Sequence, residues 1–220
     1  MLTERQSQIL NTLTDVYIGT AWPVSSDMLF KTGFFDISCP TIRNEMANLT
    51  EQGYLAQPHT SAGRIPTQRG YRFFVDDLMK SIGEVEPSRV SAHNKHEKSV
   101  QSVAEEVAQQ ISDLVVFADR GGKIEYRGLK KVLGNPEFAS RDTILSLIEE
   151  LEHFEHRVAR VMTNMEEEIT VFIGNENPFF ERDEYSVITS RFDNQLMVLV
   201  GPMRMNYRRN LEVLARYFFE

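Results

Sequence analysis

The chain has 220 residues, and 24 Lys and Arg against 32 Asp and Glu give a formal net charge of −8. Its composition, 41% hydrophobic and 25% charged, excludes collagen-like, low-complexity and wholly disordered chains. A single cysteine excludes a disulfide scaffold, and no apolar run approaches the ~18–20 residues of a membrane span. Without a basic, apolar leader at its start, the chain is predicted to be cytoplasmic and free of membranes.

The charge is unevenly distributed. Residues 1–80 hold seven basic and eight acidic residues, a net of −1, so the remaining −7 lies in residues 81–220. No acidic residue occurs between Glu51 and Asp76. The overall acidity therefore does not exclude nucleic-acid binding by the first part of the chain, although three arginines in the acid-free stretch are close to chance.

Two short helices are predicted at the start of the chain. The first, over residues 4–19, begins with a Thr-x-x-Gln capping box and continues with apolar residues at helical spacing. The second begins at Ser25 or Ser26 and ends at Gly33, because serine caps helices and glycine terminates them.

A third helix begins at Ser38 or Cys39, with a proline in its first turn. Ile42, Met46 and Leu49 are spaced four and three apart, so they form one buried stripe. The same periodicity leaves five polar side chains facing outward: Thr41, Arg43, Asn44, Glu45 and Asn48.

A short β-hairpin is predicted over residues 57–66, because Pro58 and Pro66 are incompatible with a helix and Ala62-Gly63 permits a tight reversal. Thr67 then caps a fourth helix, whose apolar face comprises Tyr71, Phe74, Val75, Leu78 and Met79. Three short helices followed by a hairpin are typical of a winged helix-turn-helix, in which the third helix enters the major groove and the hairpin, or wing, contacts the DNA backbone or minor groove.

The exposed polar residues have the chemistry that DNA recognition needs. Arg43 can donate two hydrogen bonds to guanine, and Asn44 or Asn48 can pair with an adenine edge. Small polar and cationic groups of the wing can bind phosphates, although a solvated helix face would show the same residue types. The predicted DNA contacts are Ser38, Thr41, Arg43, Asn44, Asn48, His59, Thr60, Ser61, Gly63, Arg64, Arg69 and Arg72.

Residues 81–97 are predicted to form a linker, because they combine Gly83, Pro87 and mixed charge with little apolar content. A helix follows, with apolar residues spaced three, four, four and three apart: Val100, Val103, Val107, Ile111 and Leu114. Such a stripe is usually an ordinary core face, and a coiled-coil-like dimer seam is the alternative.

The remainder of the chain is predicted to be an α+β domain with an antiparallel sheet. Strands are expected at residues 114–118, 124–126, 169–173, 185–192 and 196–200, with a hairpin turn at Asp193-Asn194. A long helix capped by Asp142 carries seven apolar residues: Ile144, Leu145, Ile148, Leu151, Phe154, Val158 and Val161. Asn206 caps a final helix with Leu211, Leu214, Ala215 and Phe218 inward.

Several sequence runs resemble one bacterial family. TIRNEM at residues 41–46, GYL at 53–55, QPHTSAGRIPT at 57–67 and GYRFFVD at 70–76 closely resemble the start of HrcA, the heat-inducible transcription repressors. The resemblance covers essentially residues 2–79. It continues more weakly through residues 128–138, 173–178 and 201–207.

This resemblance implies a homodimer that binds an inverted repeat upstream of chaperone operons, with a GAF-like middle domain, an inserted dimerising domain and support from the GroEL chaperonin. Between Leu114 and Gly128 the chain has about a dozen residues where the family carries several strands and the inserted domain. The predicted architecture is therefore mainly α plus α+β: a winged helix-turn-helix domain over residues 1–80, a linker over 81–97, and a reduced, dimerising GAF-like domain over 98–220 with a different dimer contact.

Other functions have weaker support. Cys39 at a helix start permits a redox switch, but a small capping residue explains it better. The pairs His93/His96 and His153/His156 lack the third ligand that zinc needs. No catalytic or phosphate-binding motif is visible, so we predict no enzyme activity, metal or cofactor. The alternative function is a transcription regulator of another regulon that senses a ligand or partner through its C-terminal domain.

Overall fold

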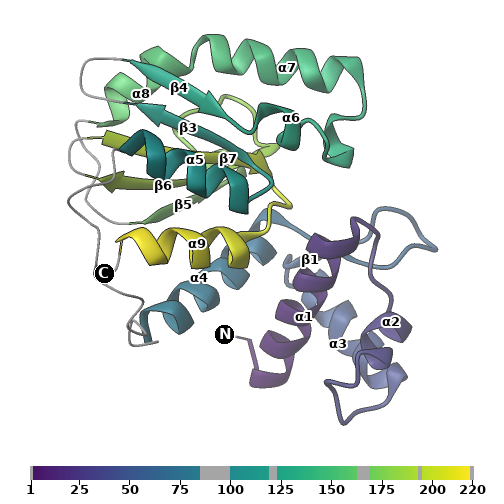
Figure 1. Cartoon of the computed structure of the whole chain (residues 1–220). Helices are drawn as coiled ribbons and strands as arrows, with labels where there is room; N and C mark the ends of the chain where they lie inside the picture. Colours follow the sequence, from purple (N-terminus) through teal and green to yellow (C-terminus); the bar gives the residue numbers. More distant parts are fainter. Residues whose placement is uncertain (1, 85–99, 119–122, 163–168, 193–194, 219–220) are drawn as a thin grey trace. The chain divides into compact units, whose positions relative to one another are not determined.

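A computed structural model describes residues 2–84, 100–118, 123–162, 169–192 and 195–218. The chain divides into two compact units, Met1–Lys80 and Ser81–Glu220, which are described separately (Figure 1). Residues 81–84 of the predicted linker are helical, because the fourth helix continues to Glu84, so the linker cannot begin at residue 81. The rest of the predicted linker, residues 85–97, lies outside the described residues.

The first unit consists of four helices and a small two-stranded sheet. In chain order these are α1 (Glu4–Thr20), α2 (Ser26–Lys31), α3 (Cys39–Glu51), β1 (Leu55–Ala56), β2 (Ile65–Pro66) and α4 (Gln68–Glu84). The capping box predicted at the start of α1 is present between Thr3 and Gln6. Ser25 caps α2 and Ser38 caps α3, so one of the two candidate caps is confirmed for each helix.

The core of the first unit lies between α1 and α3. Ile9, Leu10 and Leu13 of α1 are buried in one cluster with the predicted stripe of α3, Ile42, Met46 and Leu49. Four of the five predicted apolar residues of α4, namely Tyr71, Phe74, Val75 and Leu78, are also buried. Helical periodicity therefore located the inward faces of three helices.

An antiparallel hairpin is confirmed, but its first strand, Leu55–Ala56, lies before the predicted range of residues 57–66; Leu55 faces Pro66 and Ala56 faces Ile65. The chain reverses at Thr60-Ser61, two residues before the predicted Ala62-Gly63, because the Ala62 amide donates to the His59 carbonyl oxygen at 2.9 Å. Gly63 instead passes next to Val24, where a Cβ atom would lie less than 3.0 Å from backbone atoms. The close approach, and not the turn, is what requires a glycine here.

The second unit is built on a five-stranded antiparallel sheet in the order β4-β3-β7-β6-β5. The strands are β3 (Leu114–Ala118), β4 (Ile124–Arg127), β5 (Thr170–Ile173), β6 (Tyr185–Phe192) and β7 (Gln195–Pro202). The helices are α5 (Val100–Gln110), α6 (Leu129–Val132), α7 (Arg141–Glu152), α8 (Phe154–Met162) and α9 (Tyr207–Phe218), with 3-10 turns at Pro136–Phe138 and Gly174–Glu176. The predicted turn residues Asp193 and Asn194 lie outside the described residues.

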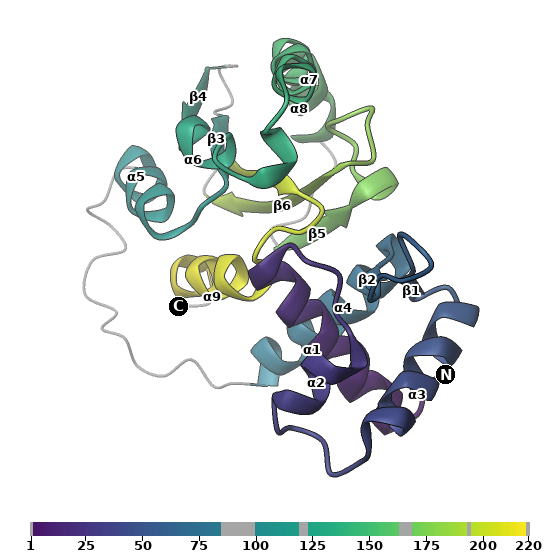
Figure 2. The same ribbon diagram turned by 90° about the vertical axis from the view of Figure 1, so that its right-hand side faces the viewer.

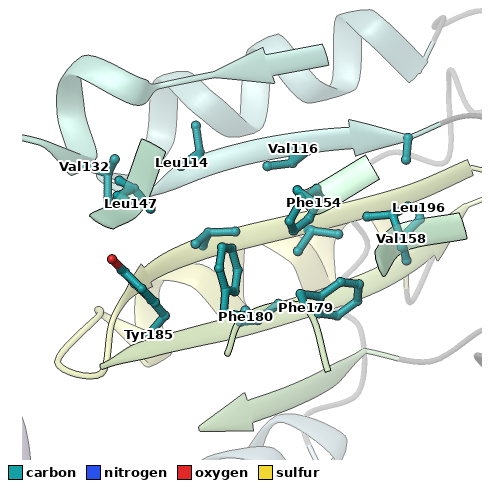
Figure 3. Packing of buried hydrophobic residues seen from close by; sticks show 14 of the residues in the cluster. Leu114, Val116, Val132, Leu147, Phe154, Val158, Phe179, Phe180, Tyr185 and Leu196 are labelled. Atoms are coloured by element: carbon teal, nitrogen blue, oxygen red, sulfur yellow. The ribbon is translucent and has the colours of Figure 1, made fainter. Parts of the chain in front are cut away.

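Helices cover both faces of this sheet: α7 and α8 lie on one face, and α5 and α9 lie on the other (Figures 1 and 2). Leu114 and Val116, which alternate along β3, form a buried cluster with side chains of α7 and α8 (Figure 3). The helical members of this cluster are Leu147, Phe154 and Val158. All five residues of β3 are buried, as expected for a strand covered on both faces. The α+β class with an antiparallel sheet is thus confirmed.

Of two predictions about the helices of the second unit, one is confirmed and the other is wrong. Val103, Val107 and Ile111 are buried within their own chain, which confirms the ordinary core face over the dimer seam. The prediction of a single long helix is wrong, because the helix is interrupted at His153, between α7 and α8.

The N-cap of α7 is also corrected. Ser140 caps the helix, with its Oγ accepting from the Thr143 amide at 3.1 Å, and Asp142 lies within the first turn. Leu145 and Ile148, both predicted inward, are 44% and 40% exposed. Leu147 is buried instead, so the apolar stripe did not identify the inward face of this helix.

Candidate nucleic-acid interface

The start of α3 is held by two hydroxyl groups. The Oγ of Ser38 accepts from the Thr41 amide at 3.4 Å, and the two side-chain oxygens lie 2.9 Å apart in a second hydrogen bond. Pro40 occupies the first turn, where its missing N–H leaves no backbone bond unmade. Both hydroxyls therefore first serve to define where the helix begins.

The outward face of α3 presents three long polar side chains. Arg43, Asn44 and Asn48 are all exposed, and Asn44 and Asn48 lie one helical turn apart on the same face. Within the described residues the structure assigns these three side chains neither a hydrogen bond nor an ion pair. They can consequently bond to another molecule without breaking contacts within the protein.

Glu45 does not belong to this face, which corrects its predicted outward position. Its side chain is only 18% exposed and accepts a hydrogen bond from Gln6 at 3.1 Å, with Arg5 at 3.8 Å. The carboxylate is therefore directed toward α1. This orientation removes from the outward face a charge that would repel phosphate.

The tip of the hairpin is exposed and ordered by its own contacts. His59, Thr60 and Ser61 are exposed, as their predicted role requires. The Gln57 amide donates to the carbonyl oxygens of Thr60 and Ala62, at 2.9 and 3.1 Å, and so fixes the loop from inside. Sequence reasoning did not assign this role to Gln57, because glutamine has no strong turn preference.

Gly63 and Arg64 connect the hairpin to the rest of the unit. Arg64 exchanges two backbone hydrogen bonds with Val24, at 2.8 and 2.9 Å. Its side-chain Nε donates to the Thr50 hydroxyl of α3 at 3.0 Å. Arg64 thus joins the hairpin to the end of α3, a structural role that its positive charge alone did not indicate.

Arg69 has an equally structural position. Its guanidinium donates to the Gln52 carbonyl oxygen at 2.8 Å, where α3 ends, and to the Tyr54 hydroxyl at 3.3 Å. It also lies 4.3 Å from the centroid of the Tyr54 ring. Arg72 pairs with Asp76 at 3.4 Å on α4. These two arginines are engaged within the chain and are not brought next to Arg43 by any contact in the structure.

Two exposed aromatic side chains were missed. Trp22 is 73% exposed before the segment that bridges to the hairpin, and Phe34 is 78% exposed between α2 and α3. Neither belongs to the apolar stripe of a helix, so periodicity did not draw attention to them. The signal that could have identified Trp22 as exposed is its position beside Pro23 in a connection between two helices.

The other singled-out groups form no site in the described residues. The thiol of Cys39 is partly buried and donates to the Ser26 hydroxyl at 3.4 Å. No three His, Cys, Asp or Glu side chains of the described residues are grouped to hold a metal ion. His93 and His96 lie outside those residues. None of the helices described is both long and apolar enough to cross a bilayer.

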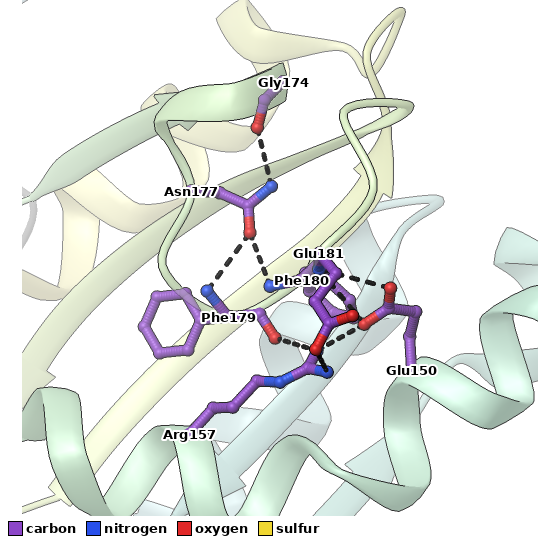
Figure 4. Close-up of polar contacts among 7 residues, drawn as sticks. All are labelled: Glu150, Arg157, Gly174, Asn177, Phe179, Phe180 and Glu181. Carbon is purple, nitrogen blue, oxygen red and sulfur yellow. Dashed lines mark hydrogen bonds and ion pairs between the residues drawn. The ribbon is translucent and has the colours of Figure 1, made fainter.

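The second unit contains a network of mostly buried polar groups that bind one another (Figure 4). The Asn177 side chain accepts from the amides of Phe179 and Phe180, at 3.1 and 2.7 Å, and donates to the Gly174 carbonyl oxygen at 2.8 Å. Buried Glu150 pairs with Arg157. These contacts hold the loop after β5 against α7 and α8.

Arg157 is the centre of this network. It also donates to the Phe179 carbonyl oxygen at 2.8 Å and pairs with Glu181 at 3.1 Å. The Glu181 amide donates to both oxygens of Glu150, at 3.2 and 3.3 Å. None of these side chains is among the buried polar groups left without a partner in the described residues, so the network has the properties of a structural element.

A second buried carboxyl group lies at the start of β3. Asp113 is 3% exposed and accepts a hydrogen bond from the Asn210 amide of α9 at 2.7 Å. Burial raises the pKa of Asp113 to about 6, against the opposing effects of the Asn210 hydrogen bond and the Arg204 charge. The carbonyl side of Asn210 is itself buried without a partner.

The fold and the exposed face of α3 define a class: a chain with a small helical unit that presents a polar helix, followed by an α+β unit with a sheet covered on both faces. A solved structure, described as the crystal structure of a hypothetical protein, has this fold, with a TM-score of 0.82. It is 18% identical, and the match covers 100% of this chain and 97% of that one.

Sequence comparison gives the particular family. The family model described as the HrcA protein C terminal domain matches residues 76–211, and the chain belongs to the HrcA family. Among relatives named heat-inducible transcription repressor HrcA, that of Desulforudis audaxviator is 45% identical over 120 residues, covering 53% of this chain and 35% of the relative.

Two further relatives with that name match different extents of the chain. The protein of Acetivibrio thermocellus is 57% identical over 79 residues, 36% of this chain and 22% of its own. That of Carboxydothermus hydrogenoformans is 40% identical over 144 residues, 62% of this chain and 42% of its own. The chain thus matches from about a fifth to two fifths of the length of these relatives.

Proposed function

We propose that this protein is a sequence-specific DNA-binding repressor of heat-shock or chaperone genes, which acts as a homodimer on an inverted repeat. In this proposal residues 1–80 are a winged helix-turn-helix domain and residues 98–220 a reduced GAF-like domain. The cytoplasmic location and the GroEL-type chaperonin partner that the family resemblance implies belong to the same proposal.

The observation that carries the proposal is the outward face of α3. Arg43, Asn44 and Asn48 are exposed and unengaged in the described structure, whereas Glu45 is directed away from them. An arginine and two asparagines have the donors and acceptors that match guanine and adenine edges in the major groove. The contacts of Glu45 with Gln6 and Arg5 keep its carboxylate away from this face.

The hairpin contributes a different kind of contact in this proposal. Thr60 and Ser61 at its exposed tip can donate to phosphate oxygens, which positions a protein on DNA without reading sequence. Arg64, which joins the hairpin to Thr50, fixes the position of this tip relative to α3. Base reading and backbone positioning are thereby assigned to separate elements of the first unit.

The test is selection of bound DNA from a random pool by the purified chain, followed by sequencing. Enrichment of an inverted repeat is expected, because two related copies of α3 on a two-fold axis require related half-sites. Failure to enrich any motif would contradict the proposal. Loss of dimeric binding alone would instead leave enrichment of a single half-site.

Variants of the outward face connect the selected sequence to α3. Arg43→Ala is expected to cost ~1–3 kcal/mol on the selected site and to relax preference at one base pair. Arg182→Ala is the matched control, since Arg182 is an exposed arginine of the second unit. Equal binding of the selected site by the wild type and Arg43→Ala would refute the reading role of Arg43.

A further inference from the structure

The outward face of α7 carries an unusual stripe of four residues. Arg141, Leu145, Ile148 and Glu152 are spaced four, three and four apart, so they share one face of the helix, and all four are exposed. Leu147 and Glu150 are buried on the opposite side. The stripe consists of two apolar side chains in the middle, a cation at one end and an anion at the other.

Leu145 and Ile148 are among only six large hydrophobic side chains that are exposed in the described residues, at 44% and 40%. They are neighbours on one face, and α7 forms the outermost layer on its side of the sheet (Figure 1). Covering both with another apolar surface would be favourable, because it removes apolar area from water.

The stripe is complementary to itself when it is reversed. Its midpoint falls between Ser146 and Leu147, with the apolar pair placed symmetrically about that point and the charged pair symmetrically outside it. A two-fold axis through this midpoint, perpendicular to the helix, brings Leu145 against Ile148 of a second copy. The same axis brings Arg141 against Glu152 of that copy.

We propose that α7 is a self-association surface, on which α7 of a second copy of this chain packs antiparallel along this stripe. A parallel arrangement is disfavoured, because it would set Arg141 against Arg141 and Glu152 against Glu152. In the antiparallel pair two partly buried side chains flank the stripe on one side, and Ile144 of each copy meets Leu151 of the other.

The acidic residues that border the stripe, Asp142 and Glu149, are on its other side and exposed. In an antiparallel pair they lie at the rim, where water and salt screen their repulsion. The contact cannot be strong on its own. The twelve residues of α7 extend about 18 Å, which is too little surface for the ~1,000 Å² of a stable interface.

The surface is therefore suited to pairing copies that are already held together. Two copies bound to adjacent half-sites experience a raised effective concentration, and a weak contact then adds to their affinity. This functional use rests on the proposed DNA-binding function, whereas the association of α7 with its copy does not. The inference deepens that proposal by naming a contact surface between the two copies.

Cysteine cross-linking of the full-length chain distinguishes the arrangements. In a Cys39→Ser background, Arg141→Cys and Glu152→Cys are made separately and then oxidised mildly, alone and mixed, at a protein concentration high enough to populate a weak contact. A disulfide needs Cα atoms within ~7 Å. In the antiparallel pair the mixed positions are adjacent, while each position is about 16 Å along the axis from its own copy.

The expected result is a mixed disulfide dimer about tenfold more abundant than either self-linked dimer. Asp183→Cys, an exposed position in a loop of the same unit, gives the level expected from random collisions. Leu145→Glu added to both proteins should reduce the mixed product to that level. Cross-linking no greater than the collisional level, or self-linked dimers in excess, would overturn the proposal.

Binding to the selected inverted repeat separates this inference from the proposed function. Leu145→Glu is expected to leave binding to a single half-site unchanged and to lower affinity for the repeat about tenfold, with loss of cooperativity. If no variant binds DNA but the mixed disulfide forms, the proposed function fails and the self-association surface stands. If the repeat is bound and the mixed disulfide is absent, the surface fails alone.

Discussion

The two units use polar side chains in opposite ways. The first unit leaves Arg43, Asn44 and Asn48 exposed on α3, with no partner among the described residues. The second places Glu150 and Asn177 in its interior and satisfies them with side chains and backbone of its own. Exposed polar groups are available for recognition, whereas buried ones are committed to holding the fold, because an unpaired buried group is costly.

The comparison also applies to cations within one unit. Arg43 and Arg69 both belong to the first unit and are both exposed, yet Arg69 donates to the Gln52 carbonyl oxygen and the Tyr54 hydroxyl. Exposure alone therefore does not identify a binding residue. The absence of internal partners is the more informative property, and it favours α3 over α4 as the reading element.

The largest expected effect comes from emptying the core of the second unit. Phe154 is fully buried, with its ring centroid 5.6 Å from that of Phe179 and 5.5 Å from that of Phe180. Phe154→Ala should cost ~3–5 kcal/mol of unfolding free energy. Chemical denaturation monitored by circular dichroism measures the loss for the second unit.

Trp22 is the only tryptophan and lies in the first unit, so its fluorescence reports that unit separately. Its transition should stay in place in Phe154→Ala if the two units unfold independently. Leu129→Ala, at an exposed apolar residue of α6, serves as the control and should change stability by less than ~0.5 kcal/mol. A matching shift of the Trp22 transition would show that the units unfold together.

A pH-dependent effect is expected from Asp113. The pKa of its carboxyl group is raised to about 6 in the folded chain, against an ordinary value of 3.8. The folded state therefore holds the proton more tightly, so the contribution of Asp113 to stability is greatest below pH 3.8 and is lost as the pH rises through about 6. At pH 7 this ionisation costs about 3 kcal/mol.

Asp113→Asn should flatten that part of the pH dependence and raise the stability of the second unit at pH 7. An asparagine keeps an acceptor for Asn210 and adds a donor that its unpartnered oxygen can use after rotation of the amide. Denaturation midpoints at several pH values between 4 and 8 measure the difference from the wild type. In the control Asp183→Asn, at an exposed residue, the midpoints should follow the same pH dependence as in the wild type. If the midpoints of Asp113→Asn also ran parallel to those of the wild type, the Asp113 carboxyl group would stay ionised down to pH 4 and the prediction would be wrong.

A smaller effect is expected where the hairpin passes the start of α2. Gly63→Ala places a methyl group less than 3.0 Å from the backbone of Val24, so the bridge between Val24 and Arg64 must shift. Overpacking of this kind costs ~1–3 kcal/mol. Loss of stability should appear in the Trp22 fluorescence transition.

Gly19→Ala is the matched control, because nothing lies within 4 Å of a Cβ at that glycine. This helical position should tolerate the methyl group or gain stability from it. An unchanged Trp22 transition in Gly63→Ala would mean that Val24 moves aside freely, and the assigned reason for the glycine would be wrong.

Local chemistry made much of the first unit predictable. The capping box at Thr3 and Gln6 and the stripe of Ile42, Met46 and Leu49 depend only on spacing within a helix, and both were found where expected. The destination of Arg64 was not predictable in this way. Its partner Thr50 is fourteen residues away, and no local pattern specifies such a contact.

The second unit shows the same limit more strongly. Periodicity predicted one helix through His153 with Leu145 and Ile148 inward, and both expectations were wrong. Apolar residues occur on both sides of α7, so spacing alone could not tell which side meets the sheet. Buried Glu150 escaped prediction because its partners belong to α8 and to the loop after β5.

The smallest expected effect separates stability from recognition at one residue. Ser38→Ala removes the hydroxyl that accepts from the Thr41 amide and should cost ~1 kcal/mol, measured by the Trp22 transition. Ser38→Asp keeps a capping oxygen and complements the helix dipole, so stability should be retained. Its negative charge lies at the exposed start of α3, and binding to the selected DNA should weaken and lose part of its salt dependence. If Ser38→Asp bound DNA as well as the wild type, the N-terminus of α3 would lie away from the phosphates. The direction in which α3 lies in the major groove of the proposed complex would then have to be reversed.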